Sequence, residues 1–351
     1  MERTFPLSQA TGQPGLDVMR RVLLVNDTRL VGHHGSSAVV DVILHEFAER
    51  GVAVETDLQL GLAVDAIEPG PWSAVIINGE GAMHSGQRYS HAFSRLGERM
   101  QKQSVPVFLI NTVFAEDAPE IIARMKSFTA VYCREAGSAD RLRATGAVSK
   151  LCPDLTFALR LPADLKWQPG KCIVMLDTTV SGKNRVLHKF SIDHGITFQP
   201  IRASPRLIRA ASSRNILRIL RFNMTKSLGK LLRRTYAFNR YANAVTDRLA
   251  FLRGLADGTC VVVASRFHGV CFCLKLGVPF LAIASNTPKI EGLLTDADLT
   301  DRLLDIGDLN MDAIRARSHW TTLHEERRQR YVSAAQSTIA RMFDDISKAV
   351  R

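Results

Sequence analysis

The sequence predicts an α/β protein with two domains. Short apolar runs typical of buried strands alternate with stretches of helical length, first over residues 22–146 and again from residue 172 onward. A polar, Pro-containing stretch at 160–171 separates the two series. The chain of 351 residues is also longer than one hydrophobic core usually serves. We therefore expect two parallel sheets that carry helices and face each other across a cleft.

In the first half, strand-like runs alternate with two clear helices. A helix is expected to begin at Ser36 or Ser37, which are suitable N-caps, and to stop at Gly51. A shorter helix is expected over 137–146. Apolar runs of strand type occur at 22–25, 52–54, 74–77, 105–114 and 128–135.

The second half repeats the pattern and ends in helices. Strands are expected at 172–176, 195–201, 260–265 and 278–284. The expected organisation is a disordered leader (1–20), an N-terminal α/β domain (21–163), a C-terminal α/β domain (164–310) with a basic insert (202–253), and C-terminal helices (311–351).

The formal net charge of +12 is concentrated in one segment. Residues 202–253 hold 13 of the 46 Lys and Arg but one of the 34 Asp and Glu, which leaves 33 of each sign elsewhere. Leucines and isoleucines within this segment recur at helical spacing, with the basic residues mostly on another side. Such a helix suits an anionic membrane surface, while a solvated flap or an oligomer contact is the alternative.

Other features indicate a cytoplasmic protein that needs no metal. No apolar run has the length of a membrane span, and the N-terminus lacks the apolar core of a signal peptide. None of the six cysteines forms a CxxC pair, which fits a reducing compartment. Asp296 and Asp298 imitate a metal-binding DxD motif, but they lie well past any expected strand end.

Polar residues at strand ends mark the expected site, because ligands of parallel sheets bind beyond the carboxyl ends of the strands. The most informative stretch is Ser265-Arg266-Phe267-His268, between a strand and a helix. Arg266 offers a fork for a phosphate or carboxylate, and His268 can move a proton near neutral pH. The alternative is an Arg in a structural ion pair and a His that caps the helix.

A second group of candidates follows the earlier strands. Gly79 and Gly81 would let the backbone approach a ligand, and Glu80 would orient a sugar hydroxyl or act as a base. The alternative is a tight turn with a solvated Glu80. Asn26 and His84 complete this group.

Three further residues are weaker candidates. Arg134, at a strand end, would hold an anion or else pair with Glu135. Asp154 would cap a turn or contribute to the site, and Lys289, after the last expected strand, could reach the cleft.

Taken in order, these stretches resemble the polysaccharide pyruvyl transferase family. The matching segments are "VNDT", "INGEGAMH", "YCREAGSADRLRATGA" with "CPDLTFAL", and "VVVASRFHGVCFCLKLGVPFLAIASNTPKIEGLL". Many members have a run of glycines where this chain has Gly79-Glu80-Gly81, and residues 172–257 take no part in the likeness.

The resemblance implies a GT-B-like architecture and a donor site at Arg134, Arg266 and His268. The implied donor is phosphoenolpyruvate, and the implied acceptor is a sugar of a surface polysaccharide or its lipid-linked precursor. No cofactor and no metal are implied. A GT-B glycosyltransferase that uses a nucleotide sugar is the alternative. A non-catalytic basic binding protein is a weaker third reading, and binding of nucleic acid is not expected, because the basic segment lacks interleaved aromatic residues and any nucleic-acid motif.

Overall fold

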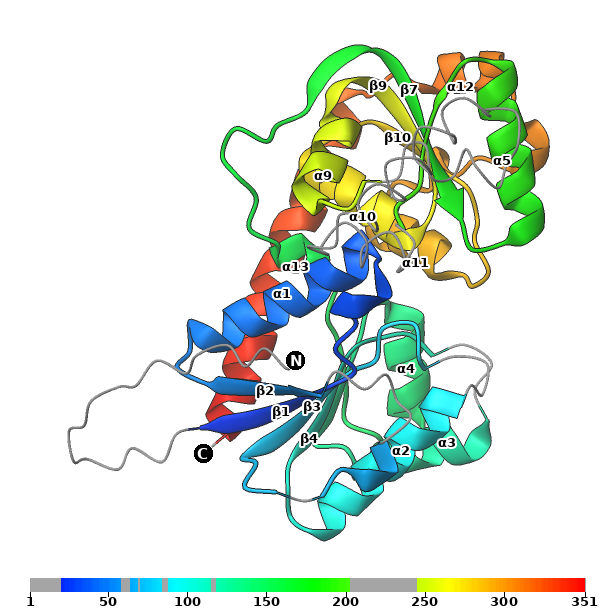
Figure 1. Ribbon diagram of the computed structural model, residues 1–351. Helices are drawn as coiled ribbons and strands as arrows, with labels where there is room; N and C mark the ends of the chain where they lie inside the picture. Colours follow the sequence, from blue (N-terminus) through cyan, green and yellow to red (C-terminus); the bar gives the residue numbers. More distant parts are fainter. Residues whose placement is uncertain are drawn as a thin grey trace, which may run out of the picture.

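The chain folds into two parallel α/β sheets that face each other, as a computed structural model shows (Figure 1). The structure describes residues 20–57, 64–68, 70–83, 88–114, 118–202 and 245–350. The predicted fold class is therefore confirmed. Most of the basic segment, residues 203–244, lies outside the described residues, and so does the helix expected there.

The first sheet has six strands in the order β2-β1-β3-β4-β5-β6, and all its neighbours are parallel. Nearly every residue of the inner strands is buried, because helices cover both faces. The strands are β1 (Arg21–Val25), β2 (Ala53–Asp57), β3 (Ala74–Asn78), β4 (Val107–Thr112), β5 (Ala130–Cys133) and β6 (Ser149–Leu151).

The second sheet has four parallel strands in the order β10-β9-β7-β8. They are β7 (Gln168–Thr178), β8 (Thr197–Gln199), β9 (Asp257–Ser265) and β10 (Phe280–Ala282). Strand β7 begins four residues before the expected strand at Cys172, inside the polar stretch that the sequence suggested as a linker.

Helices form the outer layers of both sheets (Figure 1). Alternate residues of β1 point to opposite faces, so Leu24 packs toward α1 and α13, while Leu23 packs toward α2 and α4. The helices are α1 (His34–Ala48), α2 (Arg88–Lys102), α3 (Pro119–Arg124), α4 (Ala136–Ala144), α5 (Ser181–Asp193), α9 (Arg248–Ala256), α10 (Phe267–Leu276), α11 (Lys289–Asp296), α12 (Met311–Arg317) and α13 (Thr322–Ala349).

Helix α13 ties the two halves together. Near its start, Arg328 donates a hydrogen bond to the carbonyl of Leu274 in α10. Near its end, Phe343 packs edge-on against Phe47 of α1, with ring centroids 5.1 Å apart. The apolar cluster on this side is continuous from the first sheet to the second, so the facing sheets share part of one core.

The topology predicts where a ligand binds. In each sheet the first strand lies between the second and third strands of its series, so the order in which strands are added reverses there. This switch point lies between β1 and β3 in the first sheet and between β7 and β9 in the second. Ligands of doubly wound sheets bind outside the carboxyl ends of the strands at such a switch point. The loops after these four strands are therefore the expected place for the site.

The start of α1 differs from the sequence prediction. The N-cap is His33, not Ser36 or Ser37, and its Nδ1 accepts hydrogen bonds from the amides of Gly35 and Ser36. An imidazole nitrogen satisfies the free amides of the first turn as a Ser hydroxyl would. The predicted stop is confirmed, because α1 ends at Ala48 and Gly51 has a φ of +67°.

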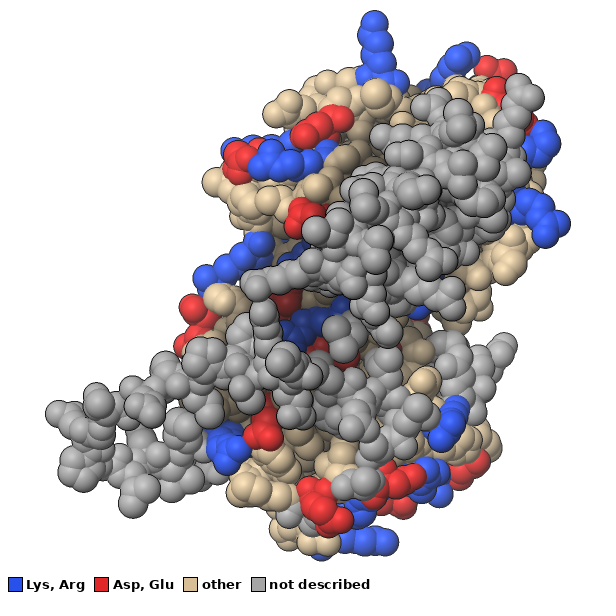
Figure 2. Space-filling model, in the orientation of Figure 1, with Lys and Arg blue, Asp and Glu red and all other residues tan. Residues whose placement is uncertain are grey.

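None of the helices in the described part of the chain combines the length and apolar character needed to cross a membrane. Acidic and basic side chains are interspersed over the face shown in Figure 2, and charges of both signs are also visible in the recess between the two halves.

Candidate active site

A cavity of about 130 Å³ lies where the loops at the two switch points meet. One wall comes from α1, from the turn after β3 and from the end of β5, and the other comes from the loops after β7, β9 and β10. The lining residues are His33, Ser36, Glu80, Gly81, Arg134, Thr179, Arg266, Phe267, His268, Ser285 and Lys289. The cavity thus brings together six residues that the sequence singled out: Glu80, Gly81, Arg134, Arg266, His268 and Lys289.

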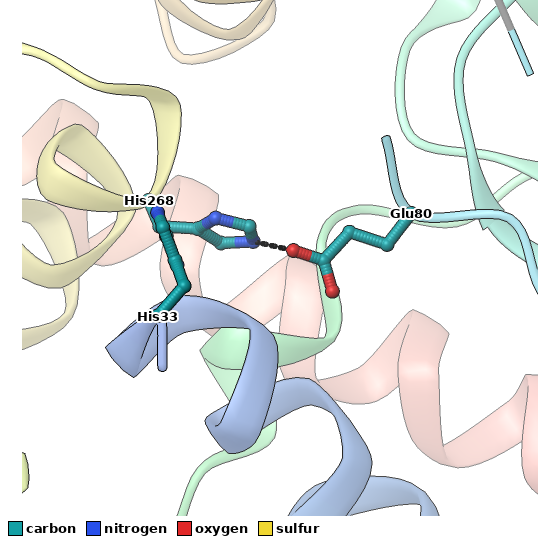
Figure 3. A group of neighbouring side chains, drawn as sticks. All are labelled: His33, Glu80 and His268. Carbon is teal, nitrogen blue, oxygen red and sulfur yellow. Dashed lines mark ion pairs between the residues drawn. The ribbon is translucent and has the colours of Figure 1, made fainter. Parts of the chain in front are cut away.

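His268 lies at the centre of the polar groups. Its Nε2 is 3.5 Å from Oε1 of Glu80 (Figure 3). The same nitrogen is 3.5 Å from Oδ2 of Asp154. This nitrogen is buried and has no hydrogen-bond partner among the described residues. A proton on Nε2 would therefore face two carboxylates, both at ion-pair distance and neither at close hydrogen-bond distance.

Glu80 is held in place by residues of α1 and of the loop after β1. Ser36 Oγ donates a 2.7 Å hydrogen bond to Oε1, and Thr28 Oγ1 donates a longer one of 3.4 Å to Oε2. The side chain is 8% exposed, so this carboxylate is fixed and only slightly hydrated. The solvated Glu80 that the sequence left open is therefore not observed.

Arg134 pairs with Asp154 and not with the neighbouring Glu135. Its Nη1 donates to Oδ2 of Asp154 at 2.9 Å, and its guanidinium lies 4.8 Å from the ring centre of Phe267. Its Nε is buried without a partner among the described residues. Since an unpaired buried donor costs free energy, this N–H is a candidate contact for a substrate anion.

Asp154 caps a turn, as the sequence suggested, and it also lies close to His268. It caps the turn at 155–158 by accepting hydrogen bonds from the amide and hydroxyl of Thr156, and it faces His268. Burial by itself would raise the pKa of Asp154, but the charges of His268 and Arg134 outweigh it and hold the pKa below its usual value. Asp154 therefore remains ionised beside the imidazole.

Arg266 is the N-cap residue of α10 and makes an ion pair with Asp177 at the end of β7. Its Nη2 lies 2.5 Å and its Nε 3.2 Å from Oδ2 of Asp177. The ion pair proposed as an alternative reading is thus present, but Arg266 also lines the cavity. The same side chain can be positioned by Asp177 and still meet a ligand through its remaining N–H groups.

Lys289 is the cavity's cation without a carboxylate partner among the described residues. Burial lowers its pKa to about 8, and the nearby charges of Arg134 and Arg266 add to this effect. Glu80 and Asp154 act in the opposite direction. An anion that enters the cavity would relieve the repulsion among these three cations.

Four predicted site residues lie behind the cavity or outside the described residues. Asn26 donates a 2.6 Å hydrogen bond to the carbonyl of Asn78 and ties β1 to β3. Ser265 is buried and bonded to Thr178, and Gly79 packs against Thr112 of β4. His84 lies outside the described residues.

The sequence reasoning missed His33, Ser36, Thr179, Phe267 and Ser285 as lining residues. The strand-end argument could have found the first two, since they follow β1 by a short loop. His33 and Ser36 do not follow β1 directly, because the 3₁₀ turn Arg29–Val31 separates them from the strand. An argument restricted to the residues directly after each strand therefore omits them.

Gly35 lets α1 approach His268 closely. A Cβ on Gly35 would lie 2.2 Å from Cγ of the His268 ring, which is far inside van der Waals contact. The first turn of α1 therefore acts as a support for the imidazole, and only glycine allows this distance.

The arrangement suits binding of an anionic group beside a residue that can move a proton. It combines an imidazole near two carboxylates with three cations from two domains, around one small cavity. Such a site defines a transferase at the interface of two α/β domains. The chain belongs to the polysaccharide pyruvyl transferase family, whose sequence model matches residues 35–287.

Known structures show only a distant likeness. The uncharacterized protein KP1_0663 from Klebsiella pneumoniae subsp. pneumoniae NTUH-K2044 is 15% identical with a TM-score of 0.47, over 82% of this chain and 92% of that one. The glycotransferase of kitacinnamycin is 11% identical with a TM-score of 0.48, over 94% and 98% of the two chains. The glycosyltransferase SnogD from Streptomyces nogalater is 12% identical with a TM-score of 0.39, over 94% and 99%. No curated protein matches the sequence.

Proposed function

We propose that this transferase moves a pyruvyl group from phosphoenolpyruvate onto two hydroxyls of a sugar and so forms a pyruvate ketal. The observation that carries the proposal is His268, whose Nε2 lies 3.5 Å from each of two carboxylates beside a cavity lined by three cations. The reaction needs a proton donor and a site for two anionic groups, and both requirements are met within one cavity.

The size of the cavity favours a small donor. The described residues enclose about 130 Å³, whereas sites for drug-sized ligands usually measure about 300–1,000 Å³. Phosphoenolpyruvate has three carbons, one carboxylate and one phosphate. A nucleotide sugar would place most of its atoms outside this space.

The cations match the donor's charges. Among the described residues, Lys289 has an ammonium and Arg134 an Nε–H without a hydrogen-bond partner, and Arg266 has N–H groups that do not contact Asp177. Charge-assisted hydrogen bonds of this kind are stronger than neutral ones. Phosphate and carboxylate can therefore each be held by cations while the carbon skeleton remains near His268.

The first half of the reaction uses His268 as an acid and Glu80 as a base. The imidazolium transfers its proton to the methylene carbon, which becomes a methyl group and leaves the adjacent carbon electrophilic. A sugar hydroxyl attacks that carbon and passes its proton to Glu80, which Ser36 and Thr28 hold in position.

The second half closes the ketal. The carbon–oxygen bond to phosphate breaks, phosphate leaves, and the neighbouring sugar hydroxyl takes its place. Of the two hydroxyl protons, one balances the proton given to the methyl group and the other leaves with phosphate. Asp154 stays ionised throughout and stabilises the imidazolium.

A donor comparison on the purified protein tests the proposal. Phosphoenolpyruvate should bind in isothermal titration calorimetry, and phosphate release should require a glycan acceptor whose mass rises by one pyruvate ketal. Binding of nucleotide sugars without binding of phosphoenolpyruvate would reject the proposal in favour of glycosyl transfer.

The acceptor is proposed to be a polysaccharide sugar or its lipid-linked precursor, reached at the inner face of a membrane. The support is the excess of Lys and Arg in residues 202–253, since each such residue near an anionic surface contributes about 1 kcal/mol. In liposome flotation the protein should be recovered with anionic vesicles. Equal, weak recovery with neutral and anionic vesicles would contradict membrane docking.

A further inference from the structure

The cavity contains a second imidazole, that of His33, whose protonation pattern is set by the helix it caps. Nδ1 of His33 accepts the amide hydrogens of Gly35 at 3.1 Å and Ser36 at 3.2 Å. Both partners are donors, so Nδ1 carries no proton. The proton of the neutral ring must therefore lie on Nε2.

These hydrogen bonds decide between a metal site and a hydrogen-bond donor. His33, Glu80 and His268 each offer one possible ligand atom, and these atoms lie within 4.8 Å of one another (Figure 3). Two imidazoles and a carboxylate would suit a divalent transition metal. However, a metal bound through Nδ1 would displace the two amide hydrogens, and a metal bound through Nε2 would leave the ring proton on Nδ1, where it would meet them. Metal binding by His33 would thus break the cap of α1.

The surroundings of His33 also keep its ring neutral. Burial, followed by the charge of His268, holds the pKa of His33 well below its usual value, and further positive groups act in the same direction. Glu80 is the carboxylate that faces the ring. The positive and titratable groups around it are His34 on α1, Arg202 in the bridge to the α1 loop, and Arg266 and His268 at the start of α10.

We propose that His33 is a substrate-binding residue whose Nε2–H donates a hydrogen bond to an anionic oxygen of the substrate. The rings of His33 and His268 lie 5.2 Å apart at an interplanar angle of 63°, so one ligand can meet both. Their partners differ, since His268 faces two carboxylates and His33 is held by two amides. His268 is thus equipped to move a proton, and His33 to donate a hydrogen bond without releasing its proton.

The ligand group is a phosphate or a carboxylate oxygen, and its assignment to phosphoenolpyruvate rests on the proposed function. Lys289 lines the same cavity and attracts the anion through its charge, while the N–H of the neutral His33 ring orients one of the anion's oxygens. A neutral imidazole adds a hydrogen bond without adding to the repulsion among the three cations. This separates its role from that of Arg134 and Arg266.

The test compares His33→Asn with His34→Asn. Asn at position 33 can still cap α1 through its side-chain oxygen, but it has no N–H at the position of Nε2. His34 is the matched control, because it is buried beside His33, bonds to the carbonyl of Val245 and does not line the cavity. Thermal unfolding of both variants reports any loss of fold.

Binding of inorganic phosphate, pyruvate and phosphoenolpyruvate is measured by calorimetry. His33→Asn should weaken phosphoenolpyruvate and one of the two simpler anions by about tenfold or more, because a hydrogen bond to a charged group is lost. The simpler anion that weakens identifies the contacted group. His34→Asn should leave all three affinities within about twofold. Equal binding by His33→Asn and the wild type would overturn the proposal.

Histidine ring NMR provides a readout that a purely structural role would not change. The His33 ring should show the Nε2–H tautomer from pH 6 to 9, and its Nε2–H signal should shift when the contacted anion is added. Titration of His33 near pH 6.5, or micromolar zinc binding that changes the signals of both His33 and His268, would overturn the proposal.

The outcome for His33 is separable from that for the reaction. If nucleotide sugars bind and phosphoenolpyruvate does not, pyruvyl transfer fails, but the same two variants compared with the nucleoside diphosphate still decide the role of His33. A wild-type protein that binds none of these anions would reject both proposals.

Discussion

Each half of the molecule contributes one arginine to the cavity lining, and each arginine pairs with an aspartate outside that lining. The two pairs differ in their exposure to solvent. Arg134 and Asp154, from the first half, have side chains that are 5% and 0% exposed. Arg266 and Asp177, from the second half, are 15% and 10% exposed. We call Arg134–Asp154 the closed pair and Arg266–Asp177 the open pair. Their arginines lie on opposite walls of the cavity.

We expect this difference to separate positioning of His268 from binding of the donor. Asp154 contacts Arg134 and also faces His268, so the closed pair lies beside the His268 imidazole. Asp177 orients Arg266 and accepts the amide of Ile201. We therefore expect the closed pair to govern stability and proton transfer and the open pair to govern donor affinity.

The largest effect is expected from breaking the closed pair. Asp154→Ala leaves a buried guanidinium without its carboxylate, which typically costs about 3–5 kcal/mol of the free energy of unfolding. Asp177→Ala should cost less, about 1.5–3 kcal/mol, since one charged hydrogen-bonded contact is lost in a more open place. Urea unfolding measures both losses, and equal losses would contradict the comparison.

The closed pair also has a defined pH signature. The pKa of Asp154 is lowered in the folded state, so its contribution to stability is complete above the ordinary Asp value of about 3.9. That contribution is lost as the pH falls through the folded-state pKa. The stability gap between wild type and Asp154→Ala should therefore close in strong acid.

Replacing His268 should reduce turnover while donor binding remains. General acid–base help is worth about 10²–10⁴ in rate, so His268→Ala should lose at least about 10² in kcat. Arg266→Ala should instead weaken phosphoenolpyruvate binding. Steady-state kinetics and donor titration separate the two effects, and near-normal turnover by His268→Ala would reduce His268 to a structural role.

A smaller effect is expected from Gly35→Ala, which places a methyl group between α1 and His268. This methyl would displace the His268 ring, and we expect a loss of about tenfold in kcat for a misplaced catalytic group. Gly137→Ala in α4 is the matched control, because a Cβ there meets nothing within 4 Å. Both changes favour helix by propensity, so similar turnover in the two variants would argue against the support role.

The smallest effect concerns Lys289 and pH. With a pKa of about 8, Lys289 is charged below that pH and neutral above it. The Kd for phosphoenolpyruvate should therefore rise by up to about tenfold per pH unit above pH 8. The donor phosphate, with a second pKa of about 6, titrates at lower pH and does not contribute to this rise. Lys289→Arg should remove this rise, and a rise that persists would assign the titration elsewhere.

Much of the fold was predictable because it depends on local patterns. The apolar runs at 22–25, 74–77 and 260–265 lie within β1, β3 and β9. Alternation of strands and helices predicts parallel sheets from the length of the connections alone. The N-cap of α1 was predicted incorrectly, because capping by an imidazole depends on a ring orientation that residue preferences do not describe.

The site was predictable as a set of strand ends but not as a set of contacts. Glu80, Arg134, Arg266 and His268 were found because a parallel sheet places its carboxyl ends at one edge. The partners of both arginines were not found, since Asp154 follows Arg134 by 20 residues and Asp177 precedes Arg266 by 89. Nothing local relates residues at such separations.

The sequence by itself determined the class of fold, the family and the residue types at the switch points, because periodicity and strand-end chemistry are local properties of the chain. Only the tertiary structure decided which groups meet. It placed His33 beside His268, left Lys289 as the cavity cation with no carboxylate partner among the described residues, and set the tautomer of one imidazole through a helix cap. These contacts depend on how the two sheets face each other. Packing in the shared core and close contacts such as that of Gly35 with His268 fix the distance between the sheets.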